Sequence, residues 1–356
     1  KLPNGTMRQT AWNYDLNGRL SEIKDGDKVV SYKYNGKNQL IEQNIDGMKV
    51  TFTYTKLGQL ASKVLGDNIA SLKYEYDNDG MITGRNVNGA HQLYSYDAKG
   101  QLTKVTGVDG KAVEEYVYDA AGNILKKTVD GKTTTFKYDA ANQLVSAKLP
   151  DGTVKDFSYD AAGRMVKQGD KSYAYGWMNK VMSISENGKV AANYDYQVDG
   201  QVSKRIGADG KATAYLWDGL ALIGRGDMAL TNEPYVTGGN PVIAGGKTLF
   251  NDILGTSQGT ADGEKYSAIK RDSFGEVLDN SVDGDYDYFT GKPMVEGLGY
   301  AFLFRSYQAG LGKWTTSDPL GYPDGWNNFA YVNNKLTKFI DLYGALSVEL
   351  TGTCIS

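Results

Sequence analysis

The sequence predicts an all-β protein built from tandem β-hairpins. The chain of 356 residues contains 26 Tyr and 44 Gly but only 7 Pro. Tyr favours half-buried strands, and Gly favours tight turns. A Tyr-Asp-x-x-Gly-x-Leu unit recurs along the first two thirds of the chain, and an Asp-Gly or Asn-Gly pair lies between most neighbouring units.

The Tyr-Asp unit keeps a regular spacing. Clear copies begin at Tyr14, Tyr76, Tyr96, Tyr118, Tyr138 and Tyr159, weaker ones at Tyr34, Tyr54, Tyr175 and Tyr196, and a decayed one at Trp217. From Tyr14 to Tyr159 successive units are 20 to 22 residues apart. A fixed period of this length indicates a repeat architecture in which each unit packs on its neighbours.

Each unit is predicted to contain two antiparallel strands. The pairs Asp25-Gly26 and Asp130-Gly131 illustrate the second set of turns, because Asp-Gly supplies the positive φ angles that two-residue hairpins need. Residues between turns alternate in polarity, as in 133–138, which is strand periodicity. Hairpins in series pair edge to edge into one long, twisting sheet. A propeller with about 40 residues per blade is the alternative, but the half-length period disfavours it.

Because about ten copies of the Tyr-Asp unit recur at one spacing, residues 10–218 resemble the YD (Rhs) repeat family. The resemblance implies a spiralling, cocoon-like β-shell around a cargo polypeptide. We therefore expect a YD-repeat array over residues 1–218 and a degenerate pre-core region over 219–288. In that region Asn251–Thr256 and Arg271–Leu278 are similar to stretches that precede the core in the family.

Composition excludes several classes of function. The 39 basic and 42 acidic residues are nearly balanced, so no basic field is available for nucleic acid. Cys354 and His91 are the only cysteine and histidine, which argues against disulfides, thiolate metal clusters and His-based catalysis. We expect no metal and no cofactor. No signal peptide and no apolar run of membrane-spanning length is visible.

Residues 289–344 carry a second, distinct pattern. An apolar segment ends in Arg305-Ser-Tyr307, glycines and Trp314 follow, and then comes Asp318-Pro319-Leu320-Gly321. A related tetrapeptide, 341–344, stands 23 residues after the first. This block resembles the Rhs-repeat-associated core, which implies a plug that closes the shell.

In many relatives that core is an intramolecular aspartyl protease. Carried over by position, the resemblance implies Asp318 and Asp341 as the carboxylate pair and Arg305 as the supporting cation. The cut would lie at Gly344, Ala345 or Leu346. Two close carboxylates cannot both ionise, so one can activate water while the other hydrogen-bonds the scissile carbonyl.

The sequence leaves an alternative to the protease open. Asp318 and Asp341 suit ordinary turns, in which Asp accepts backbone hydrogen bonds and Gly supplies a positive φ. Leu342 stands where the family has Pro, and Ala345 where it usually has Leu. Enzymatic activity is expected, at most, as intramolecular self-cleavage.

The predicted function is packaging and delivery of a C-terminal toxin or variable domain. Residues 345–356 are too few to fold alone, so they are expected to be the start or the remnant of that cargo. Further expected partners are a second shell protein or a secretion-apparatus protein, with the product secreted by a bacterium or shown on its surface. The alternative is an extracellular binding module, for carbohydrate or cell contact, with a core that does not cut.

Overall fold

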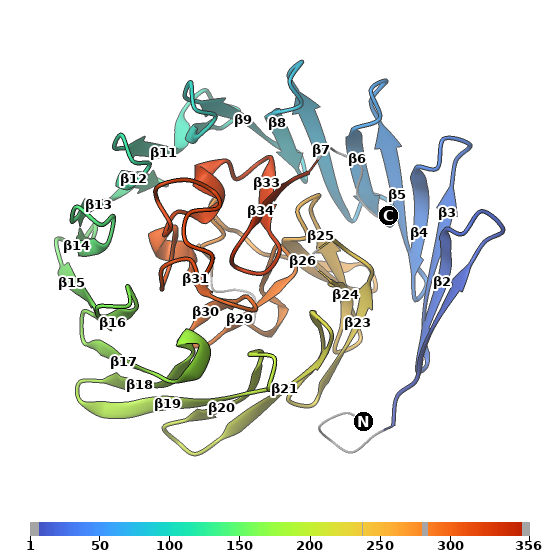
Figure 1. The fold of residues 1–356 in the computed structure, drawn as a ribbon. Helices are drawn as coiled ribbons and strands as arrows, with labels where there is room; N and C mark the ends of the chain where they lie inside the picture. The colour runs from blue at the N-terminus through green and yellow to red at the C-terminus, as the bar shows by residue number, and fades with distance from the viewer. Residues whose placement is uncertain (1–6, 237, 280–283, 351–356) are drawn as a thin grey trace.

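A single antiparallel sheet forms most of the molecule. The computed structural model describes residues 7–236, 238–279 and 284–350, and there the regular structure is almost entirely β-strand (Figure 1). Twenty-seven strands, β1 to β27, follow one another in a 27-stranded sheet, and each strand pairs antiparallel with the next. The predicted all-β array of hairpins is therefore confirmed.

The bounds of the elements are as follows. The large sheet contains β1 (Thr10–Tyr14), β2 (Leu20–Asp25), β3 (Lys28–Tyr34), β4 (Leu40–Ile45), β5 (Met48–Tyr54), β6 (Leu60–Leu65), β7 (Ala70–Tyr76), β8 (Ile82–Val87), β9 (Ala90–Tyr96), β10 (Leu102–Thr106), β11 (Ala112–Tyr118), β12 (Ile124–Val129), β13 (Lys132–Tyr138), β14 (Leu144–Lys148), β15 (Val154–Tyr159), β16 (Met165–Gln168), β17 (Lys171–Tyr175), β18 (Val181–Glu186), β19 (Lys189–Tyr196), β20 (Val202–Gly207), β21 (Ala212–Asp218), β22 (Ala221–Arg225), β23 (Met228–Glu233), β24 (Asn240–Ala244), β25 (Lys247–Asn251), β26 (Ser257–Asp262) and β27 (Lys265–Ala268). Two small sheets contain β28 (Tyr288–Phe289), β29 (Lys292–Val295), β30 (Gly299–Ala301), β31 (Ser306–Gln308), β32 (Lys313–Trp314), β33 (Phe339–Asp341) and β34 (Ser347–Glu349). Short 3₁₀ turns are η1 (Trp177–Asn179), η2 (Gly284–Tyr286), η3 (Ala309–Leu311) and η4 (Tyr331–Asn334).

The turn after each Tyr explains the recurring Asp and Gly. In the unit that begins at Tyr118, the carboxylate of Asp119 accepts the backbone N–H of Ala121 at 2.9 Å and that of Asn123 at 2.8 Å. Gly122 closes the turn with a φ of 80°, which a side chain would disfavour. Asp is therefore needed for its acceptor oxygen and Gly for its backbone conformation.

In most units the recurring Tyr joins the unit to the one before it. The hydroxyl of Tyr118 donates to the backbone carbonyl of Leu102 at 2.5 Å. The same link to an upstream carbonyl is made by Tyr34, Tyr54, Tyr76, Tyr96, Tyr138, Tyr175 and Tyr196, and by the indole N–H of Trp217. The decayed unit at Trp217 thus preserves the link with a different donor.

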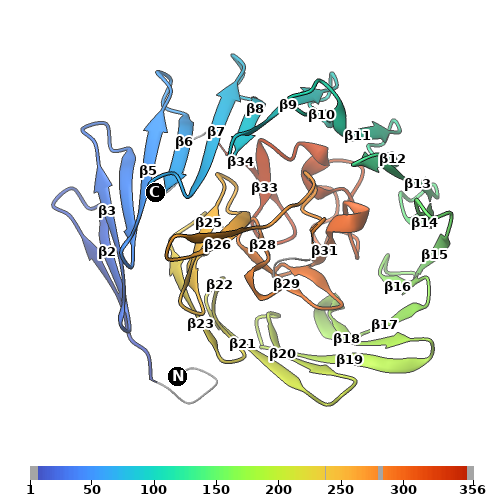
Figure 2. The same cartoon turned by 180° about the vertical axis from the view of Figure 1, so that it is seen from behind.

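The sheet curls into a spiral whose last strands lie inside its first (Figures 1 and 2). Side chains of β24 and β25, such as Ile243 and Phe250, share a hydrophobic cluster with Ile23 and Val50 of the first strands. The guanidinium of Arg8 donates to the backbone carbonyl of Leu230 at 2.7 Å. The spiral is therefore closed by packing between segments about 200 residues apart in sequence.

Residues 284–350, which we call the inner block, lie within the curve of the wall (Figures 1 and 2). The inner block contains the five-stranded sheet β28–β32 and the hairpin β33–β34. Its centre is a group of buried rings, in which Tyr307 lies 4.6 Å from Tyr331 and 5.5 Å from Trp314 between ring centroids. The same cluster takes in wall residues from Leu102 to Leu230, so wall and block share one core.

Polar side chains of the inner block contact the turns of the wall. Lys313 donates to the side-chain oxygen of Asn123 at 2.8 Å, and Asn327 donates to the same oxygen at 2.8 Å. Asn334 reaches Gln101, the equivalent position one unit earlier, at 3.0 Å. The inner block thus contacts two successive Tyr-Asp turns at the same place.

The large sheet continues past the expected end of the repeat array. Strands β22 to β27 extend it from residue 221 to residue 268, inside the expected pre-core region. The boundaries at 218, 288 and 344 stay predictions. No helix within the described ranges is long and apolar enough to span a membrane.

Candidate functional site

The three expected site residues lie together in the inner block. One nitrogen of Arg305, Nη2, contacts a carboxylate oxygen of Asp318 at 2.5 Å and one of Asp341 at 3.5 Å. All three side chains are almost fully buried. A single guanidinium nitrogen therefore joins two carboxylates that lie 23 residues apart in sequence.

Local turns hold each of these side chains in place. Arg305 ends the tight turn between β30 and β31, in which its carbonyl accepts the N–H of Phe302 at 3.1 Å. Asp318 follows β32 and accepts the N–H of Leu320 at 2.9 Å. Trp314, in β32, places its ring 4.2 Å from the guanidinium carbon of Arg305, which adds a cation–π contact.

The carboxylate of Asp341 organises the turn that follows it. Its Oδ1 atom accepts four backbone N–H groups, at 3.0 Å from Tyr343, 2.6 Å from Gly344, 3.0 Å from Ala345 and 3.3 Å from Leu346. The turn forms with Leu342 in the place of the family's Pro, and the N–H of Leu342 bonds the carbonyl of Leu346 at 3.3 Å. Proline could not make that last bond.

The peptide bond between Gly344 and Ala345 is held from both sides. Arg305 Nε donates to the carbonyl oxygen of Gly344 at 2.5 Å, while Asp341 accepts the N–H of Ala345. A Cβ on residue 344 would lie 2.9 Å from the Cβ of Phe302, and φ is 78°, so glycine is required. From the sequence, we expected a protonated Asp to donate a hydrogen bond to the carbonyl of the cut bond. In the structure, Arg305 is the residue that donates to the carbonyl of Gly344.

Burial dominates the electrostatics of the site. Burial raises the pKa of Asp318 and of Asp341 above the ordinary value, against the opposing effect of Arg305. Burial also lowers the pKa of Arg305, against the two carboxylates. Raised carboxyl pKa values extend the pH range in which one of the pair keeps a proton.

Two further charged residues belong to the site and were not singled out from the sequence. Lys292 opens β29 and is 2 % exposed; burial lowers its pKa to about 8, against the opposing charge of Asp341. Asp324 accepts the hydroxyl of Ser347 at 2.7 Å and lies close enough to oppose the charge of Arg305. Lys292 lies in residues 289–292, which open the block 289–344. Neither its position in the sequence nor that of Asp324 indicated a contact with the site.

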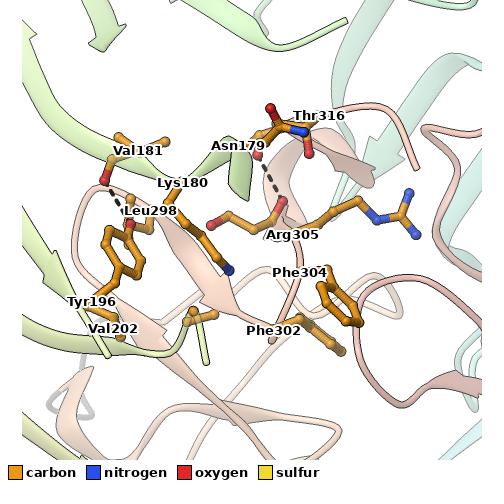
Figure 3. Close-up of a pocket in the computed structure, with 14 residues that line it drawn as sticks. Asn179, Lys180, Val181, Tyr196, Val202, Leu298, Phe302, Phe304, Arg305 and Thr316 are labelled. Atoms are coloured by element: carbon orange, nitrogen blue, oxygen red, sulfur yellow. Dashed lines mark hydrogen bonds between the residues drawn. The ribbon is translucent and has the colours of Figure 1, made fainter. Parts of the chain in front are cut away.

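A small cavity adjoins Arg305. It has a volume of about 20 Å³ and is lined by Lys180, Phe302, Arg305 and Thr316, among others (Figure 3). That volume suffices for about one water molecule. Figure 3 shows the guanidinium of Arg305 pointing away from Lys180 and Tyr196. Its contacts with Asp318 and Asp341 therefore lie on the side away from those two residues.

Within the ranges that the structure covers, no group of three or more His, Cys, Asp or Glu side chains could hold a metal ion. His91, on β9, lies 3.2 Å from Glu75 and far in sequence from the inner block. Cys354 lies outside the described residues. The charged groups at the site are therefore the carboxylates of Asp318, Asp341 and Asp324, the guanidinium of Arg305 and the amine of Lys292.

Comparisons with known proteins relate the wall to YD shells. Residues 53–220 match the family described as Teneurin YD-shell. A search of curated proteins finds no match for the chain.

Solved structures of Tc toxins match nearly the whole chain. The crystal structure of TcdB2-TccC3 without its hypervariable C-terminal region gives a TM-score of 0.68 at 15% identity, covering 96% of this chain and 22% of that one. A Tc holotoxin pore of Photorhabdus luminescens with a mutation in TccC3 gives 0.66 at 15% identity, covering 98% and 22%. The crystal structure of TcdB2-TccC3-TEV gives 0.65 at 16% identity, covering 94% and 21%.

This chain spans about a fifth of the length of those structures. Identity at this level establishes the fold and leaves activity to be argued from the residues. The repeat, the spiral sheet and these matches agree. The chain has the fold of a YD-repeat shell, and its residues 53–220 match the YD-shell family.

Proposed function

We propose that the chain forms part of a shell that encloses a polypeptide following residue 350 and separates it from the wall by self-cleavage. The curled wall and the inner block supply the shell, and the β33–β34 hairpin places the downstream chain beside the candidate site. One similar structure is described as lacking a hypervariable C-terminal region, which favours a variable cargo at this end. Delivery would require secretion or surface display by a bacterium.

The clamp on the Gly344–Ala345 peptide is the observation that carries the self-cleavage proposal. Arg305 polarises the carbonyl, and it is placed to stabilise negative charge on that oxygen as the carbon becomes tetrahedral. Of the three candidate bonds, this one joins two buried residues and is fixed at both its oxygen and its nitrogen. We therefore assign the cut to Gly344–Ala345.

Asp318 is the better proton carrier of the two carboxylates. All four turn N–H groups bond one oxygen of Asp341, whereas Asp318 accepts one backbone N–H and contacts Arg305. Ionised Asp318 would take a proton from water as the oxygen of that water adds to the carbonyl carbon of Gly344. The same proton then passes to the nitrogen of Ala345 and the C–N bond breaks. The new carboxylic acid passes its proton to the new amine, so a carboxylate and an ammonium remain.

Intact mass spectrometry tests the self-cleavage. The chain would be expressed with a long C-terminal extension, as wild type, Asp318→Asn and Asp341→Asn. Asp97→Asn is a matched control, because Asp97 makes the same kind of turn, accepting the N–H groups of Lys99 and Gln101, in the wall. We expect a cut after Gly344 in the wild type and the control, and its loss in both site variants.

One uncut mass in all four proteins would overturn the protease and leave Asp318 and Asp341 as turn residues. A cut after Ala345 or Leu346 would keep the protease and reject the assigned bond. Because Asp318 must start ionised to take the proton from water, the rate should rise with pH through the raised pKa of Asp318 and level off above it. Time courses at several pH values measure this.

Enclosure has its own test. A folded, protease-sensitive reporter placed after Ser356 should be cut more slowly by an added protease when it is attached to the shell than when it is free. Equal rates would contradict enclosure by this chain alone. The competing function, a binding module, would need patches of aromatic side chains on the outer surface. The Tyr hydroxyls of the repeat instead donate to backbone carbonyls of the neighbouring unit.

A further inference from the structure

The candidate cut lies in the turn of a hairpin. β33 pairs with β34, with Phe339 opposite Glu349 and Asp341 opposite Ser347. The Gly344–Ala345 bond stands in the turn that joins the two strands. Hydrogen bonds of a β-ladder run across strands, so breaking the turn leaves them in place.

Two contacts fasten β34 beyond its ladder. Asp324 accepts the N–H of Ser347 at 3.1 Å and its hydroxyl at 2.7 Å. At the other end, the carboxylate of Glu349 lies 3.0 Å from the ammonium of Lys338, and the N–H of Leu350 bonds the carbonyl of Lys338 at 2.8 Å. The strand is thus held at its first residue by Asp324 and at its last by Lys338.

The products of the cut would carry charges that suit their neighbours. The new carboxylate on Gly344 forms where Arg305 already donates to its oxygen. The new ammonium on Ala345 forms where Asp341 already accepts its N–H at 3.0 Å. Each hydrogen bond already has one charged partner, the Arg305 guanidinium or the Asp341 carboxylate. After the cut both partners of each bond are charged, so each bond becomes an ion pair.

We propose that β34 and its contact with Asp324 retain the downstream polypeptide after the cut, so that self-cleavage severs the chain without releasing the product. The proposal rests on the self-cleavage proposed above. Three ladder pairs alone make a marginal hairpin. The contact between Asp324 and Ser347, together with the two new charge pairs, supplies the further stabilisation that keeps β34 bound.

The experiment uses the full chain with a small folded reporter after Ser356. Denaturing mass spectrometry reports whether the chain is cut, and native gel filtration reports whether the two fragments elute together. The variant is Asp324→Asn, which loses the ionised acceptor of Ser347. Asp27→Asn is the control, because the Asp27 side chain is 88% exposed in a wall turn.

A second series supplies the cut from outside. It carries Asp318→Asn and a site for a sequence-specific protease inserted between Gly344 and Ala345, so retention can be measured even if the chain does not cut itself. The insertion removes the new charge pairs and leaves the ladder and Asp324. We expect co-elution of the nicked fragments, and dissociation faster by about tenfold with Asp324→Asn, the loss of one charge-assisted bond.

Immediate separation of the wild-type fragments in both series would overturn the retention proposal. Dissociation of the Asp324→Asn fragments at the wild-type rate would also overturn it, because trapping by the wall alone would then explain co-elution. An uncut wild-type chain in the first series, with slow dissociation in the second, would reject self-cleavage and keep retention.

Discussion

At the scale of single residues, buried charges join the wall to the parts of the chain inside it. Glu114, on β11, accepts the hydroxyl of Tyr116 at 2.7 Å and the backbone N–H of Ser273 at 3.1 Å. Beside it, Lys127 contacts Asp272 at 2.5 Å and Glu276 at 2.7 Å. Lys127 pairs with Asp272 and Glu276, whereas Asp318 and Asp341 pair with Arg305. We therefore expect the Glu114 and Lys127 cluster to act on stability.

Glu114 should make stability depend on pH. Burial, reinforced by Asp272, raises its pKa from an ordinary 4.5 to about 7. A raised folded-state pKa gives stability that is complete below the ordinary pKa and is lost as pH rises through about 7. In Glu114→Gln, a neutral acceptor remains, so the fall in unfolding free energy between pH 5 and pH 8 should shrink.

Denaturant titrations at several pH values measure that difference. Glu115→Gln, a half-exposed neighbour on the same strand, is the control and should keep the wild-type pH profile. The interpretation is wrong if Glu114→Gln and wild type lose the same stability over this range.

Arg305 should not tolerate its usual conservative replacement. Its planar group bonds the carbonyls of Gly344 and Asn328 while contacting Asp318, a geometry that the single ammonium of Lys cannot reproduce. Arg305→Lys should cost about 1–3 kcal/mol of stability, because buried acceptors lose their donors. It should also abolish any cut after Gly344.

The matched control is Arg19→Lys, which changes a partly exposed Arg–Asp pair in a wall turn. Exposed pairs contribute about 0–1 kcal/mol, so this variant should melt close to wild type. Equal melting temperatures for both variants would contradict the role assigned to Arg305.

At the scale of elements, the Tyr hydroxyl is the joint between successive hairpins. Tyr118→Phe removes only the donor to the carbonyl of Leu102, and should lower the unfolding free energy by about 0.5–1.5 kcal/mol. Tyr14, in the first unit, is 61% exposed, so Tyr14→Phe should have almost no effect. Chemical denaturation separates the two, and equal midpoints would reject the joint.

Much at this scale follows from the sequence. The repeat predicted a hairpin array with Gly at its tight turns, and Gly122 has the positive φ of such a turn. The role of Asp119 as a backbone acceptor emerged from the structure. The proximity of Asp318, Asp341 and Arg305 came from the family pattern rather than from spacing. Asp324 and Lys292 escaped prediction, because their partners lie 23 and 49 residues away, and no periodicity encodes such pairs.

At the scale of the whole molecule, the inward curl of the last wall strands was also missing from the prediction. A repeat pattern reflects contacts between neighbouring units. The curl instead depends on distant contacts, such as the hydrogen bond from Gln43 on β4 to Glu233 on β23. Arg8 secures this closure through carbonyls of β22 and β23 and an ion pair with Asp25. Its neighbourhood is therefore where the spiral should open first.

Arg8→Ala should loosen the region where the last wall strands pack inside the first ones. Asp25 is 3% exposed and would be left as a buried charge without its partner, at a cost of about 3–5 kcal/mol. Hydrogen exchange should accelerate in β1, β2, β22 and β23 and stay slow in β11 to β14. Lys24→Ala, at a side chain 58% exposed, should change nothing, and uniform acceleration in Arg8→Ala would contradict a local closure.

The inner block lies inside the wall yet follows the wall in the sequence, which sets an order for synthesis. Each hairpin of the wall pairs with the hairpin before it, so the wall can form strand by strand as the chain leaves the ribosome, at about 5–20 residues per second. Leu102, Tyr116 and Leu144, which the finished core buries, must wait for residues near 300. Until the inner block is made, the inner face of the wall exposes these apolar side chains to solvent. Any pause in synthesis before the inner block emerges therefore prolongs the time in which the nascent chain can aggregate.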